Sequence, residues 1–432
     1  MNKNKQILGL GIFSVAALLY ILVVYFISHR APKTVTEIYF ADRMTEAHYI
    51  LIDRYNAAHA GSVKVIPVNF TNSDFSTDAR KEILARSLRG EDDAIDLLAV
   101  DVIWVHRFAK WCEPLGKYFS DQERKRITEI ALLTCYHEGE LIAAPLDLVQ
   151  GVMYYREDLL KSNPYGQTII EHLKKGMTWP EFLQLRTKLN WKGPYYIYPA
   201  ADFEGFICSY IEILMSLRRD YFETVGFRFD TPEAKEALQL LVDLIHRYHV
   251  TPPIVSNFTE VPSYDYYIKN DGLFIRGWTS YEKDFTSYPM KEKYLRKAPV
   301  PYLAKGRPTS MFGGWNLMMS KATTKKDAVI DFMKYLLSDE AQEIFYARSG
   351  FYPVIKSFYY DSLSLKRYPE IQMMRELMSQ GVHRPVQENY TKYSKIMARY
   401  FSLAIIGKIS VDQALQRVQA SIESEGTQTV GR

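Results

Sequence analysis

Apolar residues gather in short runs in the first part of the chain, and the segments between them have helical spacing. Residues 35–40, 63–68 and 96–100 each have the length and composition of a buried strand. After Thr45, a residue type that caps helices, apolar positions recur at helical spacing as far as Ala58. This part of the chain therefore alternates strand and helix.

A polar loop at 69–77 and a helix through Leu88 complete the alternation before the third strand. Strands separated by helices in this way predict an α/β fold with a parallel sheet. Ligands of such sheets bind outside the carboxyl ends of the strands. We therefore expect Asp42, the loop that begins at Asn69, and Asp101 to lie on one rim.

The middle and end of the chain are more helical. Thr178 and Thr231 are expected to cap two helices, each followed closely by a proline. Four helices are predicted after residue 170, at 179–189, 206–217, 232–248 and 325–348. The last is expected to be a single amphipathic helix that ends at Gly350.

Length and composition indicate a globular protein with more than one lobe. A chain of 432 residues exceeds what one hydrophobic core usually serves. Contents of 47% hydrophobic and 24% charged residues are ordinary, and a net charge of +4 with interspersed signs argues against a nucleic-acid partner. The aromatic content of 14%, with 32 tyrosines, suits protein cores and also the faces of sugar rings.

Residues 1–30 have the pattern of a targeting segment. An uncharged run at 7–27 is long enough to cross a bilayer as a helix, and basic residues flank it, among them Lys3, Lys5 and Arg30. Because no small-x-small cleavage site follows, we expect an uncleaved membrane anchor at the periplasmic or extracellular face, with a cleaved signal peptide as the alternative.

Metal and catalytic motifs are not found. The three cysteines, Cys112, Cys135 and Cys208, lack metal-ligand spacing; a Cys112–Cys135 disulfide and two buried thiols are both open. His246 and His249 are interpreted as a solvated pair, and the acidic run 91–93 as a solvated turn. No nucleophile elbow, phosphate loop or zinc-protease motif occurs, so neither an enzyme nor a cofactor is expected.

Several stretches, in order and at matching spacing, resemble family 1 extracellular solute-binding proteins, in particular the trehalose/maltose type. The resemblance lies in residues 96–109, 139–160, 178–182, 203–208, 313–317, 338–342 and 350–353. It implies a two-lobed periplasmic-binding-protein-like fold (type II) that closes on a sugar or polyol as a hinge and delivers it to the permease subunits of an ABC importer.

By the same analogy the chain passes between lobes near 145–151, 301–304 and 350–353. The implied first lobe contains 35–146 and 305–350, and the second 147–304 and 351–425.

The resemblance also implies the binding residues. A sugar needs aromatic platforms for its ring faces and charged or amide groups for its hydroxyls. Matched positions make Asp101 a hydroxyl acceptor, Trp278 and Trp315 stacking platforms, and Gly314 a backbone contact. Five weaker candidates, for which core packing or a structural role is the alternative, are Trp104, Asp42, Asp147, Glu204 and Tyr352.

Two positions depart from this pattern or carry no role in it. The family commonly has an acid two residues before Gly151, where this chain has Val149, and Asp147 is the nearest substitute. Arg384 is expected to be a surface residue.

Two other functions remain open. A membrane-anchored protein could use the same site to report a ligand to a partner receptor. An exported carbohydrate-active enzyme would need two carboxylates about 5 to 9.5 Å apart, which Asp101 with Asp147 or Glu204 could supply.

Overall fold

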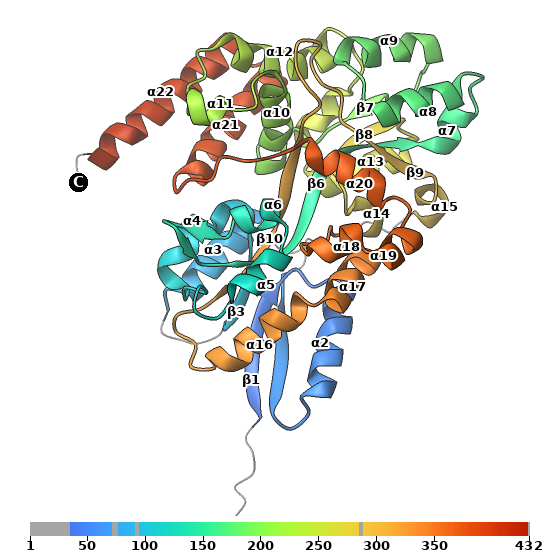
Figure 1. The fold of residues 1–432 in the computed structure, drawn as a ribbon. Coiled ribbons are helices and arrows are strands. Elements are labelled where there is room, and N and C mark those ends of the chain that lie inside the picture. The colour runs from blue at the N-terminus through green and yellow to red at the C-terminus, as the bar shows by residue number, and fades with distance from the viewer. Residues whose placement is uncertain (1–34, 71–76, 91–94, 285–287, 431–432) are drawn as a thin grey trace, which may run out of the picture.

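Two lobes joined along a pair of long strands make up the protein (Figure 1). The computed structural model describes residues 35–70, 77–90, 95–284 and 288–430. The segment 1–30, predicted to be a targeting segment, and the acidic turn 91–93 lie outside the described residues. Within the described part, no helix is long and apolar enough to span a bilayer.

The first lobe contains the strands and helices of the N-terminal part together with two later helices. Its strands are β1 (Thr36–Asp42), β2 (Val63–Asn69), β3 (Leu97–Asp101), β4 (Tyr136–His137) and β5 (Glu140–Leu141). Its helices are α2 (Glu46–Ala58), α3 (Thr77–Ser87), η1 (Val102–Trp104), α4 (Val105–Phe108), η2 (Ala109–Trp111), α5 (Asp121–Arg126), α6 (Glu129–Leu133), α16 (Lys326–Leu336) and α17 (Asp339–Ser349).

The second lobe is built mainly of helices around the other end of the sheet. Its strands are β7 (Tyr196–Ile197), β8 (Phe274–Trp278) and β9 (Leu295–Ala298). Its helices before β10 are α7 (Glu157–Lys161), α8 (Gly166–Lys175), α9 (Trp179–Leu189), α10 (Glu204–Leu217), α11 (Tyr221–Thr224), α12 (Pro232–His246), η3 (Pro253–Asn257), α13 (Glu260–Lys269), α14 (Tyr281–Asp284) and α15 (Pro289–Glu292).

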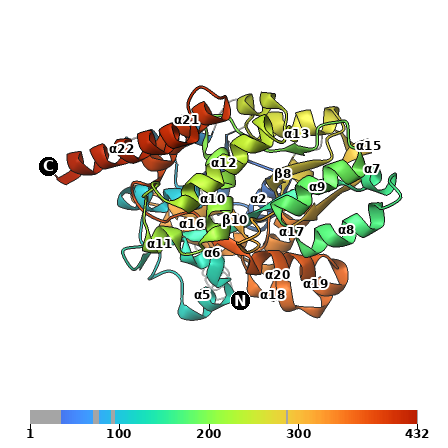
Figure 2. The same cartoon turned by 90° about the horizontal axis from the view of Figure 1, so that it is seen from above.

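The chain after α17 runs back from the first lobe to the second. It forms α18 (Lys356–Tyr360), α19 (Ser362–Arg367), α20 (Ile371–Ser379), β11 (Gly381–His383), α21 (Tyr390–Ile405) and α22 (Val411–Val430). Figure 2 shows α22 running beside α21 and extending beyond the body of the protein toward the C-terminus.

One sheet connects the lobes. Among the described residues it has nine strands, in the order β2-β1-β3-β10-β6-β8-β7, with β11 paired to β10 and β9 paired to β6. The strands β6 (Ala144–Arg156) and β10 (Ser310–Met319) are antiparallel neighbours that run through both lobes. β1 pairs in parallel with β2 and β3, as predicted, so the α/β class is confirmed. The sheet is nevertheless mixed, because β10 is antiparallel to β3 and β6.

Helix capping follows the sequence pattern closely. The side chains of Thr178 and Thr231 accept hydrogen bonds from backbone N–H groups in the first turns of α9 and α12, as predicted.

The prediction of a single helix at 325–348 is wrong. It is two helices, because Ser338 accepts a hydrogen bond from the Ala341 N–H and starts α17 anew. Gly350 ends α17 with a φ of +69°, as the glycine predicts.

All three cysteines are free buried thiols, so the alternative of buried thiols is confirmed and a Cys112–Cys135 disulfide is not formed. Burial raises the pKa of Cys112 to about 12, which keeps this thiol protonated and unreactive. The Cys135 Sγ lies 3.5 Å from the carbonyl oxygen of Ala131.

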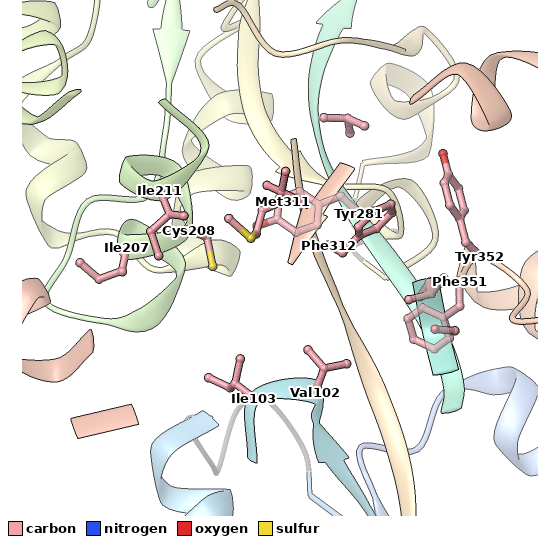
Figure 3. Packing of buried hydrophobic residues seen from close by; sticks show 14 of the residues in the cluster. Val102, Ile103, Ile207, Cys208, Ile211, Tyr281, Met311, Phe312, Phe351 and Tyr352 are labelled. Atoms are coloured by element: carbon pink, nitrogen blue, oxygen red, sulfur yellow. The ribbon is translucent and has the colours of Figure 1, made fainter. Parts of the chain in front are cut away.

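Apolar side chains from both lobes meet beside β10. Figure 3 shows Ile207, Cys208 and Ile211 on α10 close to Met311 and Phe312 on β10, with Val102 and Ile103 of η1 nearby. All of these side chains are buried. Buried apolar side chains from both lobes therefore line this part of β10.

The residue limits of the lobes remain predictions. Contacts near residues 302, 307 and 352 show which elements hold the chain there. The Tyr302 segment pairs with Thr178, and the Arg307 N–H bonds to the Ser216 carbonyl, so the chain up to 307 is held by second-lobe elements. The passage back to the first lobe is made by β10. Tyr352 pairs with Leu148 of β6, next to the end of α17.

Replacing Gly314 should destabilise this crossing. Its φ is +140°, and a Cβ there would lie 2.4 Å from the Asp147 carbonyl oxygen. We expect Gly314→Ala to lower the free energy of unfolding by about 1–3 kcal/mol, the cost of a strained backbone residue. Urea unfolding measures this, and Gly116→Ala is the control, since a Cβ there meets nothing within 4 Å. Equal stability of the two variants would contradict the assignment of strain to Gly314.

Candidate functional site

Polar residues end the three parallel strands at one edge of the first lobe. β1 ends at Asp42, β2 at Asn69 and β3 at Asp101, and Asp42 is the register partner of Asn69. The predicted rim is therefore confirmed for Asp42, Asn69 and Asp101, whereas residues 71–76 of the predicted loop lie outside the described part of the chain. Since β10 joins the sheet beside β3, residues from distant parts of the sequence lie next to this rim.

Trp315 lies in the middle of a row of three residues on neighbouring strands. It is paired with Asp101 of β3 on one side and with Asp147 of β6 on the other. Trp315 is partly exposed, whereas Asp147 is 2% exposed. Trp104 is also 2% exposed and packs edge-on against Trp315, with ring centroids 5.8 Å apart. Trp104 is thus a core residue that supports Trp315 from within the first lobe.

Trp278 reaches the same place from the second lobe. It is the last residue of β8 and pairs with Gly151 of β6. A Cβ on Gly313 would lie 3.3 Å from the Trp278 ring, so this indole rests on β10 two residues before Trp315. Trp278 is partly exposed as well. The structure therefore brings the two predicted platforms to one short segment of β10, each from its own lobe.

A buried guanidinium lies against each of these two indoles. The Arg80 Cζ is 4.1 Å from the ring centroid of Trp315, and the Arg276 Cζ is 4.2 Å from that of Trp278. Both distances are within the range of a cation–π interaction. The sequence pattern did not identify either arginine.

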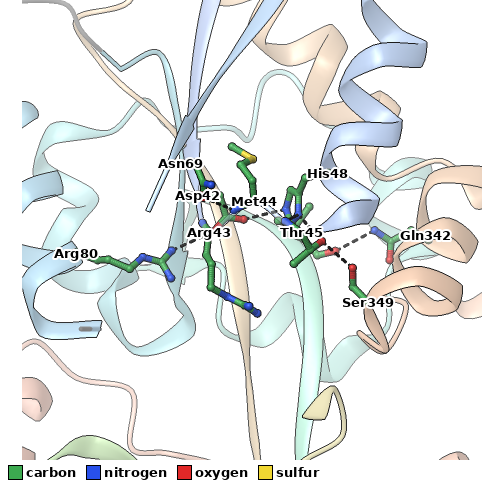
Figure 4. A network of polar contacts seen from close by, with 10 residues as sticks. Asp42, Arg43, Met44, Thr45, His48, Asn69, Arg80, Gln342 and Ser349 are labelled. Atoms are coloured by element: carbon green, nitrogen blue, oxygen red, sulfur yellow. Dashed lines mark hydrogen bonds and ion pairs between the residues drawn. The ribbon is translucent and has the colours of Figure 1, made fainter. Parts of the chain in front are cut away.

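Asp42 holds Arg80 in place (Figure 4). Its Oδ1 accepts hydrogen bonds from Arg80 Nη2 at 3.0 Å and from the Arg43 backbone N–H at 2.6 Å. Its Oδ2 lies 3.0 Å from His48 Nε2. Burial alone would raise the pKa of Asp42, but His48, Arg80 and Arg43 outweigh burial and lower this pKa. Both oxygens therefore have protein partners, and one of these is the guanidinium that lies against Trp315.

The same network reaches the end of α17, next to the predicted third passage between the lobes at 350–353. His48 Nδ1 accepts a hydrogen bond from the Thr45 N–H at 3.1 Å, and the Thr45 hydroxyl lies 2.7 Å from that of Ser349. Ser349 is the last residue of α17, directly before Gly350. A continuous set of polar contacts therefore connects Arg80 with this passage.

Arg384 bridges the two lobes, contrary to the expectation that it is a surface residue. Its side chain is 3% exposed and lies between β11 and α21 in the sequence. Its Nη2 donates to Asp101 Oδ1 at 2.6 Å, and its Nη1 donates to Glu204 Oε1 at 3.1 Å. Asp101 belongs to the first lobe and Glu204 to α10 of the second. Spacing along the chain gave no signal for this contact.

Two acids of the second lobe are easier to protonate than usual. Burial raises the pKa of Glu204, although Arg384, Ser394 and Tyr390 act against it. Burial also raises the pKa of Glu260, where the charge of Arg276 and a hydrogen bond with Trp278 act against it. The Tyr390 hydroxyl donates to Glu204 Oε1 at 2.8 Å. Glu204 thus lies beside the bridging Arg384, and Glu260 lies beside Trp278.

Tyr352 is 1% exposed, and its backbone pairs with Leu148. Its place is in the third passage, next to Gly350, and not at the exposed surface of the indoles. His246 and His249 are both exposed; His246 Nε2 lies 2.8 Å from the Ile405 carbonyl oxygen. No group of three or more acidic, histidine or cysteine side chains that could hold a metal is found in the described part of the chain.

The site residues can therefore stack on ring faces and exchange hydrogen bonds with hydroxyl groups. The two indoles provide flat apolar surface, and Asp101, Glu204 and Arg384 provide charged donors and acceptors.

Comparison with known proteins agrees with this geometry. The family model described as "Bacterial extracellular solute-binding protein" matches residues 39–343. A probable ABC transporter-binding protein of Deinococcus radiodurans is 23% identical over 369 residues, which are 82% of this chain and 85% of that protein.

Solved structures share the fold. Maltose-bound MalE3 of T. maritima has a TM-score of 0.80 at 24% identity, covering 90% of this chain and 99% of that one. A solute-binding protein of an ABC transporter from Agrobacterium vitis with bound D-mannitol has a TM-score of 0.69 at 18% identity, covering 91% and 99%. These likenesses confirm the predicted two-lobed binding-protein fold.

Removing the bridging arginine should make stability depend on pH. Arg384→Leu leaves Asp101 and Glu204 without their cation, and loss of one partner of a buried ion pair costs about 3–5 kcal/mol. Arg384 lowers the pKa of Glu204, so its removal raises that pKa further above the unfolded value. An acid with a raised folded pKa regains stability as pH falls through that pKa. We therefore expect a larger loss at pH 8 than at pH 5.

Urea unfolding at the two pH values tests this, with the exposed Arg417→Leu as the control. A loss of equal size at both pH values would contradict the role assigned to Glu204.

Proposed function

We propose that this chain, which belongs to the family of bacterial extracellular solute-binding proteins, captures a di- or oligosaccharide or a polyol between its lobes and delivers it to the permease of an ABC importer. Proteins of this family bind solutes and are not enzymes, as the sequence indicated, and membership places the chain in the periplasm or outside the cell.

The observation that carries the proposal is the convergence of Trp278 and Trp315 on β10. Each comes from a different lobe, each is partly exposed, and the Trp278 ring lies against Gly313. Flat indole faces bind the apolar C–H faces of pyranose rings, and two of them from separate lobes suit a ligand that both lobes enclose. This supports a hinge that closes on the ligand.

Asp101 is proposed as the hydroxyl acceptor. Its Oδ1 accepts hydrogen bonds from the Ile103 N–H at 3.1 Å and from Arg384. Among the described residues, Oδ2 has no hydrogen-bond partner, so it is the oxygen that a ligand hydroxyl can approach. Asp101 is held by the protein on one oxygen and open on the other, which fixes its direction.

Glu204, Gly314 and Asp147 are proposed as further contacts or supports. Glu204 shares Arg384 with Asp101, so a hydroxyl-rich ligand near this bridge meets both a donor and acceptors. Gly314 lets the Asp147 carbonyl oxygen of β6 approach the backbone beside Trp315, and its own backbone is the proposed ligand contact. Asp147 lies on β6 opposite Trp315 and is buried.

The relatives support the ligand class and the transport role. MalE3 of T. maritima has maltose bound and the Agrobacterium vitis protein has D-mannitol bound, and both ligands are rich in hydroxyl groups. The Deinococcus radiodurans relative has a name that assigns it to an ABC transporter.

The test is truncation of each indole. We expect Trp315→Ala and Trp278→Ala each to weaken binding by about 1–3 kcal/mol, or roughly 5- to 150-fold in Kd, while the fold is retained. Isothermal titration calorimetry measures this with the tightest carbohydrate or polyol found in a thermal-shift screen.

Trp111→Ala is the matched control. Trp111 is a partly exposed first-lobe tryptophan with cations over its ring, from Arg89 at 5.4 Å and Lys110 at 4.4 Å, but it lies outside the proposed site. Unchanged affinity in both site variants, or an equal loss in the control, would refute the assignment of the platforms.

A further inference from the structure

We propose that Arg80 and Arg276 are positioning residues for the two platform indoles, each fixing the plane of one tryptophan before a ligand arrives. The inference rests on the proposed function, because it gives these arginines a purpose only if Trp315 and Trp278 receive a ligand.

In the first lobe, the guanidinium of Arg80 is buried and held by an ion pair with Asp42. Its side chain is 3% exposed, with Nη2 3.0 Å from Asp42 Oδ1. Asp42 is in turn held by the Arg43 N–H and by His48. Figure 4 shows Arg80 directed at this carboxylate. The buried ion pair keeps this guanidinium beside Trp315, whose ring centroid is 4.1 Å from its Cζ, so the ring has a fixed planar cation to stack on.

In the second lobe, Arg276 is fixed even more tightly. Its side chain is 1% exposed and donates through Nε and Nη2 to the two oxygens of Glu212, at 3.1 and 3.0 Å. Glu212 Oε1 also accepts from the Met311 N–H of β10 at 2.9 Å. A two-pronged ion pair fixes the plane of a guanidinium as well as its position. The ring of Trp278, 4.2 Å from its Cζ, is thereby aligned to the crossing strand.

Gly151 makes room for this second arrangement. A Cβ at Gly151 would lie 1.9 Å from Glu212 Oε1 and 2.8 Å from Arg276 Nη2. The ion pair of Arg276 with Glu212 therefore lies directly on the backbone of β6 at Gly151. Gly151 is also the residue with which Trp278 pairs in the sheet.

The two arginine–tryptophan pairs are supplied by different kinds of element. Arg276 and Trp278 are two residues apart on β8, so their side chains leave the same face of the strand. Arg80 comes from α3, whereas Trp315 is on β10, far away in sequence. A shared local motif cannot account for both. In each lobe the result is the same: an indole contacts a planar cation, and the cation contacts a buried carboxylate.

The arrangement implies that shape, and not charge alone, is what the arginines provide. Lysine keeps the positive charge beside Asp42 or Glu212, so the carboxylate is not left unpaired. Lysine lacks the flat guanidinium, so it cannot stack on a ring in the same way. Arg80→Lys and Arg276→Lys therefore separate positioning of the indole from neutralisation of the buried acid.

The experiment is fluorine NMR of the full chain labelled with 5-fluorotryptophan, with lines assigned by Trp→Phe variants. We expect Arg80→Lys to shift or broaden the Trp315 line and to leave the Trp278 line in place, and Arg276→Lys to do the reverse. Calorimetry with maltose as the probe should show at least about a fivefold weaker affinity in each variant. Melting temperatures check that both variants remain folded.

Arg89→Lys is the matched control, because Arg89 lies over Trp111 outside the site and is exposed. It should alter only the Trp111 line and leave the affinity for maltose unchanged. If either positioning variant fails to fold, the other decides the question.

The proposal is overturned if the Trp315 and Trp278 lines are unmoved by their own lysine variants, or if they move while the affinity for maltose stays at the wild-type value. If the wild-type chain does not bind maltose, the proposed function fails for that sugar, and the NMR lines alone still decide whether the arginines position the indoles.

Discussion

The antiparallel pairing of β6 with β10 is the constraint on which the site depends. Both strands run through the two lobes, so anything attached to them is placed relative to both. Trp315 lies on β10 between Asp101 and Asp147, and Trp278 reaches the same strand through Gly151 and Gly313. Without this pair, the residues at the strand ends of one lobe would have no fixed relation to those of the other.

Buried charge surrounds this crossing and explains how flat side chains can be held there. A charged group taken out of water must be paired, and each arginine near the site has a carboxylate partner: Arg80 with Asp42, Arg276 with Glu212, and Arg384 with Asp101 and Glu204. The first two pairs stay within a lobe and support an indole. The third joins the lobes, since Arg384 contacts Asp101 of the first lobe and Glu204 of the second.

Much of the first lobe could be predicted from the sequence because its signals are local. Strand and helix alternate at short range, and the parallel order of β1, β2 and β3 then places Asp42, Asn69 and Asp101 together. The capping residues Thr178 and Thr231 were identified for the same reason. The break at Ser338 could have been found too, since a serine followed by Asp339 and Glu340 is typical of a helix start.

The contacts that complete the site could not be predicted in this way. Arg384 meets Asp101 only because β11 and α21 return to the crossing, and no spacing in the sequence encodes that return. Arg80 was missed because it is distant in sequence from Trp315. Arg276 was missed although it is two residues from Trp278, because the pattern of a strand does not show that an arginine pairs with Glu212 of α10. Trp104 and Tyr352 were predicted as weaker site candidates because they lie in or near the matched motifs. They are only 2% and 1% exposed, so both are packed inside the protein.

The most direct measurement of the central claim is a crystal structure of the chain with the carbohydrate that stabilises it most in a thermal-shift panel. We expect ring faces of the ligand against Trp278 and Trp315 and a hydroxyl group on Oδ2 of Asp101. A ligand bound away from both indoles, or a panel in which no carbohydrate or polyol binds, would contradict it.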